Sequence, residues 1–124
     1  MKRISAVLFL VGVTATLASL NAGEAKVDFT SRELKTRVES AQTRTEHLQL
    51  ATYFEQRAQA FLDESQAQAE MVARYQADPM ASASKHSGIM MGHRQNLIKA
   101  LEDGARRMNQ FAALHRFMAR KARQ

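Results

Sequence analysis

Apolar and small side chains recur at steps of three and four residues through the first half of the chain, as on one face of an amphipathic helix. Thr30 followed by Glu33 has the pattern of a capping box, which marks a helix start. Pro79 cannot continue a helix and disfavours helical geometry in the residue before it. We therefore predict a helix over residues 31–77. Its apolar face consists of Leu34, Val38, Ala41, Thr45, Leu48, Ala51, Phe54, Ala58, Phe61, Ser65, Val72 and Tyr75.

The capping-box pattern occurs a second time inside this stretch. The letters TRTE at residues 43–46 place Thr43 three positions before Glu46. This leaves two interpretations open, one unbroken helix or two helices with a break at residues 40–45.

A second periodic stretch covers residues 88–122, after a small and polar turn at residues 78–87. The pattern predicts an all-α fold, a long antiparallel helical hairpin. A single hairpin leaves half of its apolar stripe in water, so we expect pairing into a four-helix bundle or coiled-coil-like dimer. The predicted stripe of the second arm is Met90, Leu97, Leu101, Ala105, Met108, Phe111, His115 and Met118.

The two arms resemble each other at an offset of 47 residues. Amphipathic helices of equal phase produce some of this similarity by chance. The matched positions nevertheless indicate which face of each arm is buried. They are Leu50 with Leu97, Phe54 with Leu101, Ala58 with Ala105, Phe61 with Met108, Gln68 with His115 and Met71 with Met118.

The first 25 residues have the pattern of a secretory signal peptide. Lys2 and Arg3 precede an apolar run from Ile4 to Leu20, and small residues follow. We predict cleavage after Ala25, with Ala18 as a second site, and a single helical domain at residues 26–124 in the periplasm or outside the cell. The alternative is an uncleaved membrane anchor, for which the run is short.

Composition narrows the function classes. The chain has no cysteine, which excludes disulfides, thiolate catalysis and cysteine-bound zinc. No phosphate-binding loop, nucleophile elbow or zinc-protease motif is present. No nucleic-acid recognition module is visible, and we expect no nucleic-acid partner for an exported chain. We expect a protein that is not an enzyme.

The stretches HLQLATYFEQRAQAF and FAALHRFMARKA carry a resemblance to a loosely defined group of small exported bacterial helical-hairpin proteins. Their arms show the Ala-rich patterns H-x-x-L-A and L-A-x-x-H-x-x-M-A. The resemblance covers residues 46–121 and implies an exported helical hairpin. It implies no activity, and Gln68 departs from the pattern where the second arm has His115.

Charge differs between the two arms. Residues 26–84 hold seven Lys/Arg against nine Asp/Glu, whereas residues 85–124 hold nine against two. The arms should attract each other, within one hairpin or between partners. A solvated, helix-stabilising end is the simpler interpretation of the C-terminal cations. The functional interpretation is adhesion to an anionic membrane or cell-wall surface through Arg116, Arg120, Lys121 and Arg123.

Two sets of residues are candidate metal ligands. The first is His86, Met90, Met91 and His93, since thioether and imidazole ligands suit Cu(I) or Ag(I). The second is His47, His115 and Met118, which an antiparallel hairpin brings together and to which Glu46 could add a carboxylate. Methionine is also a common packing residue, and a lone histidine on an apolar stripe is more often a core residue.

We therefore expect a small exported structural or adaptor protein that associates with itself, with another envelope protein or with an anionic surface. The alternative is a periplasmic metal-binding or metal-stress protein that uses the cluster at residues 86–93.

Overall fold

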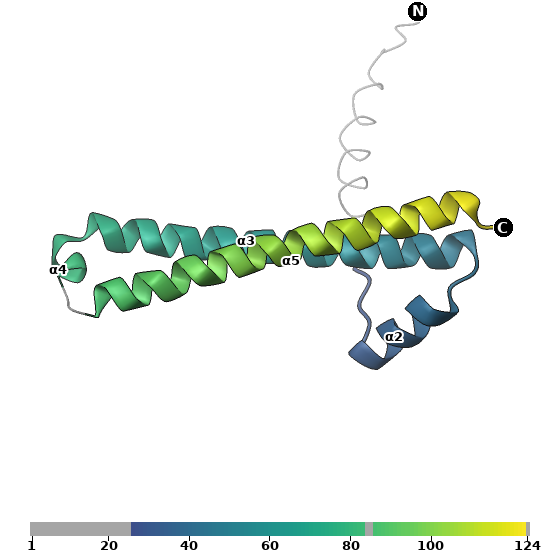
Figure 1. Cartoon of the computed structure of the whole chain (residues 1–124), viewed down its shortest axis with the longest axis horizontal. Coiled ribbons are helices and arrows are strands. Elements are labelled where there is room, and N and C mark those ends of the chain that lie inside the picture. Colours follow the sequence, from purple (N-terminus) through teal and green to yellow (C-terminus); the bar gives the residue numbers. More distant parts are fainter. Residues whose placement is uncertain (1–25, 84–85, 124) are drawn as a thin grey trace, which may run out of the picture.

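All regular structure is helical in the computed structural model, which describes residues 26–83 and 86–123. The helices are α2 (Ser31–Ser40), α3 (Arg44–Ala77), α4 (Pro79–Ser82) and α5 (Ser87–Lys121). Figure 1 shows α3 and α5 lying side by side, with α4 at one end and α2 folded back near the other. The predicted all-α class is confirmed, and a long helix packs along another. The expected signal peptide lies outside the described residues.

The first arm is two helices, as the second of the two interpretations predicted. Thr30 caps α2 and Thr43 caps α3, each through a complete capping box with the glutamate three residues later. Residues 41–43 are not helical. The internal capping box therefore marks a true helix start, and α2 is free to take its own direction. None of the helices in the described part of the chain is long and apolar enough to cross a membrane.

The predicted turn at residues 78–87 contains the short helix α4. Pro79 occupies the first turn of α4, where its missing N–H is not needed. The Asp78 carboxylate accepts hydrogen bonds from the backbone N–H groups of Met80 (3.0 Å) and Ala81 (3.4 Å). Asp78 is thus both the C-cap of α3 and the N-cap of α4.

The contact between α3 and α5 follows a seven-residue repeat in both helices. Positions alternate at steps of four and three, the spacing at which side chains of two helices interlock in a coiled coil. Eight of the twenty positions are alanine or serine, which lets the backbones approach closely. The positions of this repeat on α3, each buried or partly buried, are His47, Ala51, Phe54, Ala58, Phe61, Ser65, Gln68, Val72 and Tyr75. Those on α5 are Ser87, Met91, Arg94, Ile98, Leu101, Ala105, Met108, Ala112, His115 and Ala119, and Ala122 follows the end of the helix at the same spacing.

Part of the predicted stripe on the second arm is wrong. Met90, Leu97, Phe111 and Met118 were expected to be buried, but they are 39–50% exposed. Each lies one residue before an interface position and shares its seven-residue spacing. Alanines at 112 and 119 take the interface instead, because a small side chain suits a close helix contact better than a large one. Periodicity alone cannot choose between two neighbouring stripes.

The alignment of the two helices places polar groups opposite each other in the interface. Arg94 Nη1 donates a hydrogen bond to Gln68 Oε1 (2.7 Å) and also contacts Met71 Sδ (3.3 Å). Gln68 Nε2 donates to Glu64 Oε1 (2.7 Å). A partly buried polar pair of this kind favours one register of the two helices, because a slip leaves its polar groups without their partners.

Helix α2 and the segment before it cover the apolar end of α3. Phe29 packs against Tyr53 with ring centroids 5.3 Å apart, and the Arg37 guanidinium lies 4.6 Å from the Phe29 ring centroid. The Val27 N–H donates to Gln56 Oε1 (2.9 Å). Leu50 becomes almost completely buried under this cover, with 1% of its surface exposed.

Candidate functional site

The methionine and histidine cluster at residues 86–93 is divided between two sides of α5. His86 precedes the first turn of α5, and its carbonyl accepts the Met90 N–H (3.1 Å). His86, Met90 and His93 are exposed and follow one another at steps of four and three residues. Met91 is partly buried and occupies an interface position. A soft-metal site that uses all four side chains requires Met91 to turn out of the interface, and it stays a prediction.

The second predicted set does bring two histidines into contact. His47 lies near the start of α3 and His115 near the end of α5, and their Nδ1 atoms are 3.2 Å apart. Each histidine is only 5% exposed. The two histidine rings stack with centroids 5.4 Å apart. The Phe54 ring also stacks on His115, with centroids 5.6 Å apart and an angle of 11° between the ring planes. The pair is therefore held in place by aromatic packing as well as by its hydrogen bond.

The other members of this set are occupied elsewhere or exposed. The Glu46 carboxylate accepts hydrogen bonds from the backbone N–H groups of Gln42 (2.8 Å) and Thr43 (3.0 Å). These bonds are the main reason that the pKa of Glu46 is below its ordinary value. Met118 is 39% exposed. Across the described residues, no three His, Cys, Asp or Glu side chains come together in a way that could hold a metal ion.

The chemistry that the paired imidazoles do support is proton binding. Two facing Nδ1 atoms share a single proton in a hydrogen bond, since a second proton would set two N–H groups against each other. Burial, and next the charge of His47, lower the pKa of His115. The pair therefore resists full protonation while the helices remain packed.

The predicted cationic surface is divided as well. Arg116 forms an ion pair with Glu55 of α3 through two bonds of 2.7 Å, and the hydrogen bond from Arg116 is the main reason that the pKa of Glu55 is lowered. Arg120 and Lys121 instead lie beside the ring of Phe117, with Arg120 Cζ and Lys121 Nζ at 5.9 and 5.6 Å from its centroid. Arg116 thus joins the two helices, whereas the later cations face solvent.

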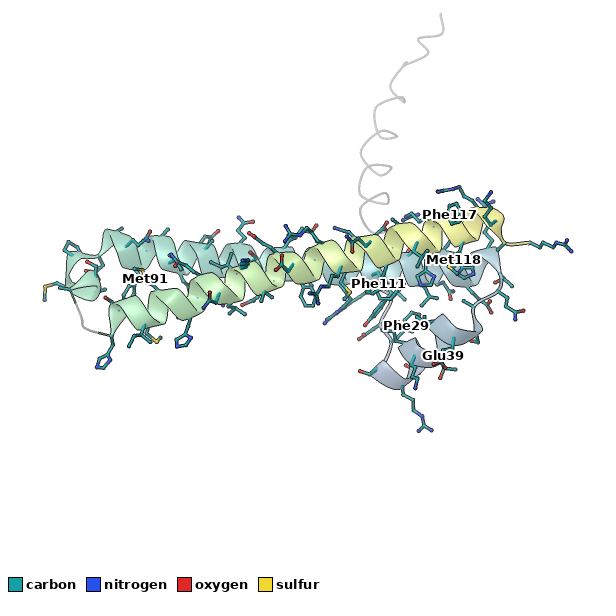
Figure 2. All side chains as sticks on the ribbon, in the orientation of Figure 1. Phe29, Glu39, Met91, Phe111, Phe117 and Met118 are labelled. Atoms are coloured by element: carbon teal, nitrogen blue, oxygen red, sulfur yellow. The ribbon has the colours of Figure 1, made fainter. Side chains whose placement is uncertain are left out.

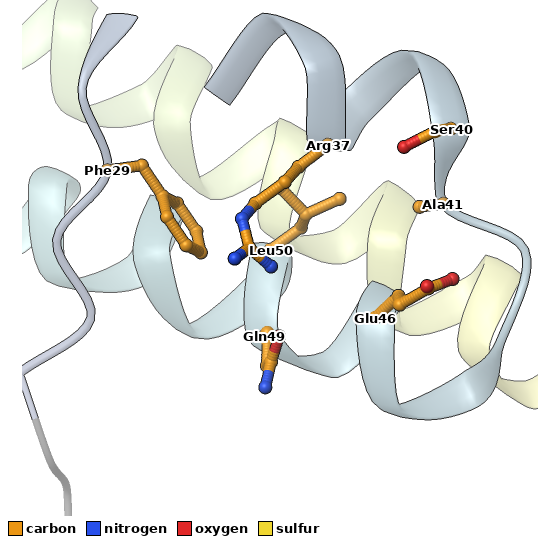
Figure 3. A pocket seen from close by; sticks show the side chains of 7 residues that line it. All are labelled: Phe29, Arg37, Ser40, Ala41, Glu46, Gln49 and Leu50. Atoms are coloured by element: carbon orange, nitrogen blue, oxygen red, sulfur yellow. The ribbon is translucent and has the colours of Figure 1, made fainter. Parts of the chain in front are cut away.

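A cavity of about 100 Å³ lies between α2 and the start of α3 (Figure 3). It is smaller than the several hundred cubic ångströms typical of ligand pockets, so it suits a few water molecules better than a substrate. Sequence reasoning missed it, because nothing in the pattern tells in which direction α2 leaves α3. Its lining residues are Phe29, Arg37, Ser40, Ala41, Glu46, Gln49 and Leu50.

Comparison with known proteins adds no relative: no family model, no curated protein and no solved structure matches the chain.

Proposed function

We propose that the protein acts after export as a non-catalytic structural or adaptor protein, in which α3 and α5 form a hairpin that pairs with a second copy in a four-helix bundle. The observation that carries this proposal is an apolar stripe along one side of α5. The stripe comprises Met90, Leu97, Phe111 and Met118, with Met71 of α3 beside it. We call these five residues the side stripe.

The spacing of the side stripe favours another helix as the occupant. Its members on α5 are multiples of seven residues apart, and Gly104 stands at the remaining place in the series. A seven-residue period keeps one stripe turned toward a neighbouring helix over many turns. A flat partner does not require that period. A second copy is the simplest source of such a helix, and the exposed apolar side chains gain by leaving water.

Charge supports a particular pairing. The basic second arm and the acidic first arm attract, so α5 of one copy is best placed against α3 of the other. Helix α2 covers the same side near one end of the pair, where Figure 2 shows Phe111 and Met118 on the edge of α5 toward α2. The partner would therefore cover mainly the stretch between α2 and α4, where Leu97 lies.

Sedimentation velocity of the processed protein over a range of concentrations tests the proposal. We expect a dimer. Leu97→Glu should shift it to monomer, because a buried unpaired charge is costly. Leu62→Glu is the matched control, since Leu62 and Leu97 are 41% and 42% exposed and Leu62 lies outside the side stripe.

A wild-type protein that stays monomeric at high concentration would refute the pairing. Equal weakening by both glutamate variants would show that the side stripe is not the interface. Circular dichroism on each variant confirms that the helices are retained.

A further inference from the structure

The last two turns of α5 expose apolar side chains outside the side stripe. Leu114 and Phe117 are each 50% exposed. The contact with α3 at this end is made by Ala112, His115 and Ala119, which are buried. Figure 2 shows Phe117 at the edge of α5 turned away from α2. The contact between α3 and α5 therefore leaves Leu114 and Phe117 half exposed.

Cations surround these apolar side chains. Arg120 and Lys121 lie beside the Phe117 ring, and Arg123 is exposed just beyond the end of α5. From residue 104 to the end, the sequence contains no Asp or Glu. Arg120, Lys121 and Arg123 form no ion pair with a carboxylate of the described residues. We call Leu114, Phe117, Arg120, Lys121 and Arg123 the basic-apolar face.

From this combination we infer that the basic-apolar face binds the surface of an anionic phospholipid bilayer. Exposed Leu and Phe side chains can enter the boundary between headgroups and acyl chains, while Arg and Lys contact the anionic headgroups above them. The face has no seven-residue repeat that would suit a second helix. Its three unpaired cations also oppose the pairing of this face with itself in a second copy.

Both kinds of side chain contribute to the binding of an anionic bilayer. A purely anionic polymer, such as an acidic polysaccharide, gains from the cations but little from a half-exposed phenyl ring. A neutral bilayer gains from the ring but not from the cations. The bilayer proposal therefore predicts that binding requires anionic lipid and depends on Phe117 as well. It does not rest on the proposed dimer, because the side stripe and the basic-apolar face have no residue in common.

The experiment is flotation of the full processed protein with vesicles. One set contains phosphatidylcholine mixed with phosphatidylglycerol, and the other contains phosphatidylcholine alone. We expect binding to the mixed vesicles that weakens as salt is raised, since salt screens the cations. Failure to bind the mixed vesicles at low salt overturns the proposal.

Two matched pairs of variants locate the contact. Arg120→Gln with Lys121→Gln removes two charges from the face, and Arg106→Gln with Arg107→Gln removes two charges from equivalent positions two heptads earlier on the same helix. At about fivefold per cation, the first pair should weaken binding about 25-fold. The second pair should weaken it far less. Equal losses would mean that net charge alone attracts the protein, which overturns the assignment of the face.

A third comparison separates a bilayer from a polyanion. Phe117→Ser should weaken vesicle binding several-fold, whereas Leu62→Ser, which changes a similarly exposed side chain on α3, should not. If Phe117→Ser has no effect while the charge variants do, the cations act alone and the bilayer proposal is overturned in favour of a polyanion. Circular dichroism and the sedimentation of each variant show whether fold and assembly are retained.

Discussion

Acidification should destabilise this protein through the buried pair of His47 and His115. Their Nδ1 atoms are 3.2 Å apart and each side chain is 5% exposed, so the folded pair accommodates one shared proton. In the unfolded chain both imidazoles bind a further proton below an ordinary pKa of about 6.5. The pKa of His115 is lower in the folded protein, first because of burial and second because of the charge of His47. The unfolded state therefore binds more protons as the pH falls.

The size of the effect follows from proton linkage. Because the folded pKa lies below the unfolded one, the stability is fully present above pH 6.5 and is lost as the pH falls from there toward the folded pKa. A difference of one proton between the two states changes the free energy of unfolding by about 1.4 kcal/mol per pH unit. A fall from about pH 6.5 to about pH 5.5 should therefore cost up to about 1.4 kcal/mol by this relation. For a domain of this size, that upper bound corresponds to a Tm lower by at most about 6–11 °C.

Nearby charged groups do not remove this effect above pH 5. Glu46, beside His47, is bonded to backbone N–H groups, and Arg116, beside His115, is paired with Glu55. The pKa values of Glu33, Glu46 and Glu55 are lowered from 4.5, chiefly by their hydrogen bonds. The stability that these carboxylates contribute is lost only as the pH falls below that value. The interval between about pH 7.5 and pH 5 therefore isolates the histidine pair, because it lies above their titration.

The assay is urea unfolding followed by circular dichroism at several pH values in this interval. The variant His115→Gln removes the second titrating ring, and His93→Gln, an exposed histidine of the same helix, is the control. We expect His115→Gln to flatten the dependence of the unfolding free energy on pH, and His93→Gln to leave it steep. The slope is compared rather than the stability itself, because His115→Gln also changes packing. An unchanged slope in His115→Gln would refute the reasoning.

Further predictions concern the helices themselves. Gly92→Ala should raise the free energy of unfolding by about 1 kcal/mol, because no described atom beyond the adjoining residues and local backbone of α5 lies within 4 Å of the new methyl group and alanine favours a helix. Gly104→Ala should gain nothing, because its Cβ would lie 3.1 Å from the Phe61 ring; urea unfolding that shows equal gains at both glycines would contradict the close contact of α3 with α5. Thr43→Ala should lower the free energy of unfolding by about 1 kcal/mol through loss of the α3 cap, with Thr36→Ala, inside α2, as the control.

The helices could be predicted from the sequence because their signals are local. Both capping boxes, the stop at Pro79 and the three-and-four spacing each act within a few residues of chain. The contact of His47 with His115 could also be predicted from the sequence, since the position of the turn determines which residues of two antiparallel helices lie opposite each other. These are consequences of helix geometry, which needs no knowledge of packing.

Which stripe of α5 is buried depends on how closely the two helices pack, and the sequence pattern therefore predicted it only in part. Phe111 is more apolar than Ala112, yet Ala112 is buried and Phe111 is 46% exposed. A pattern that ranks positions by hydrophobicity selects the larger side chain, whereas two closely approaching helices select the smaller one. The direction of α2 could not be predicted either, because it depends on tertiary contacts: Phe29 packs against Tyr53, and Arg37 of α2 lies over the Phe29 ring.

Four consecutive residues near the end of α5 have four different surroundings. His115 turns toward α3 and binds His47, Arg116 holds Glu55, Phe117 faces outward beside two cations, and Met118 lies on the side stripe. Successive residues of a helix point about 100° apart, so four neighbours can serve four different surroundings. The proposals made for three of these surroundings depend on different variables: pH for the histidines, salt for the cations, and protein concentration for the side stripe. A property of the protein that changes with one of these variables alone therefore identifies the surface that produces it.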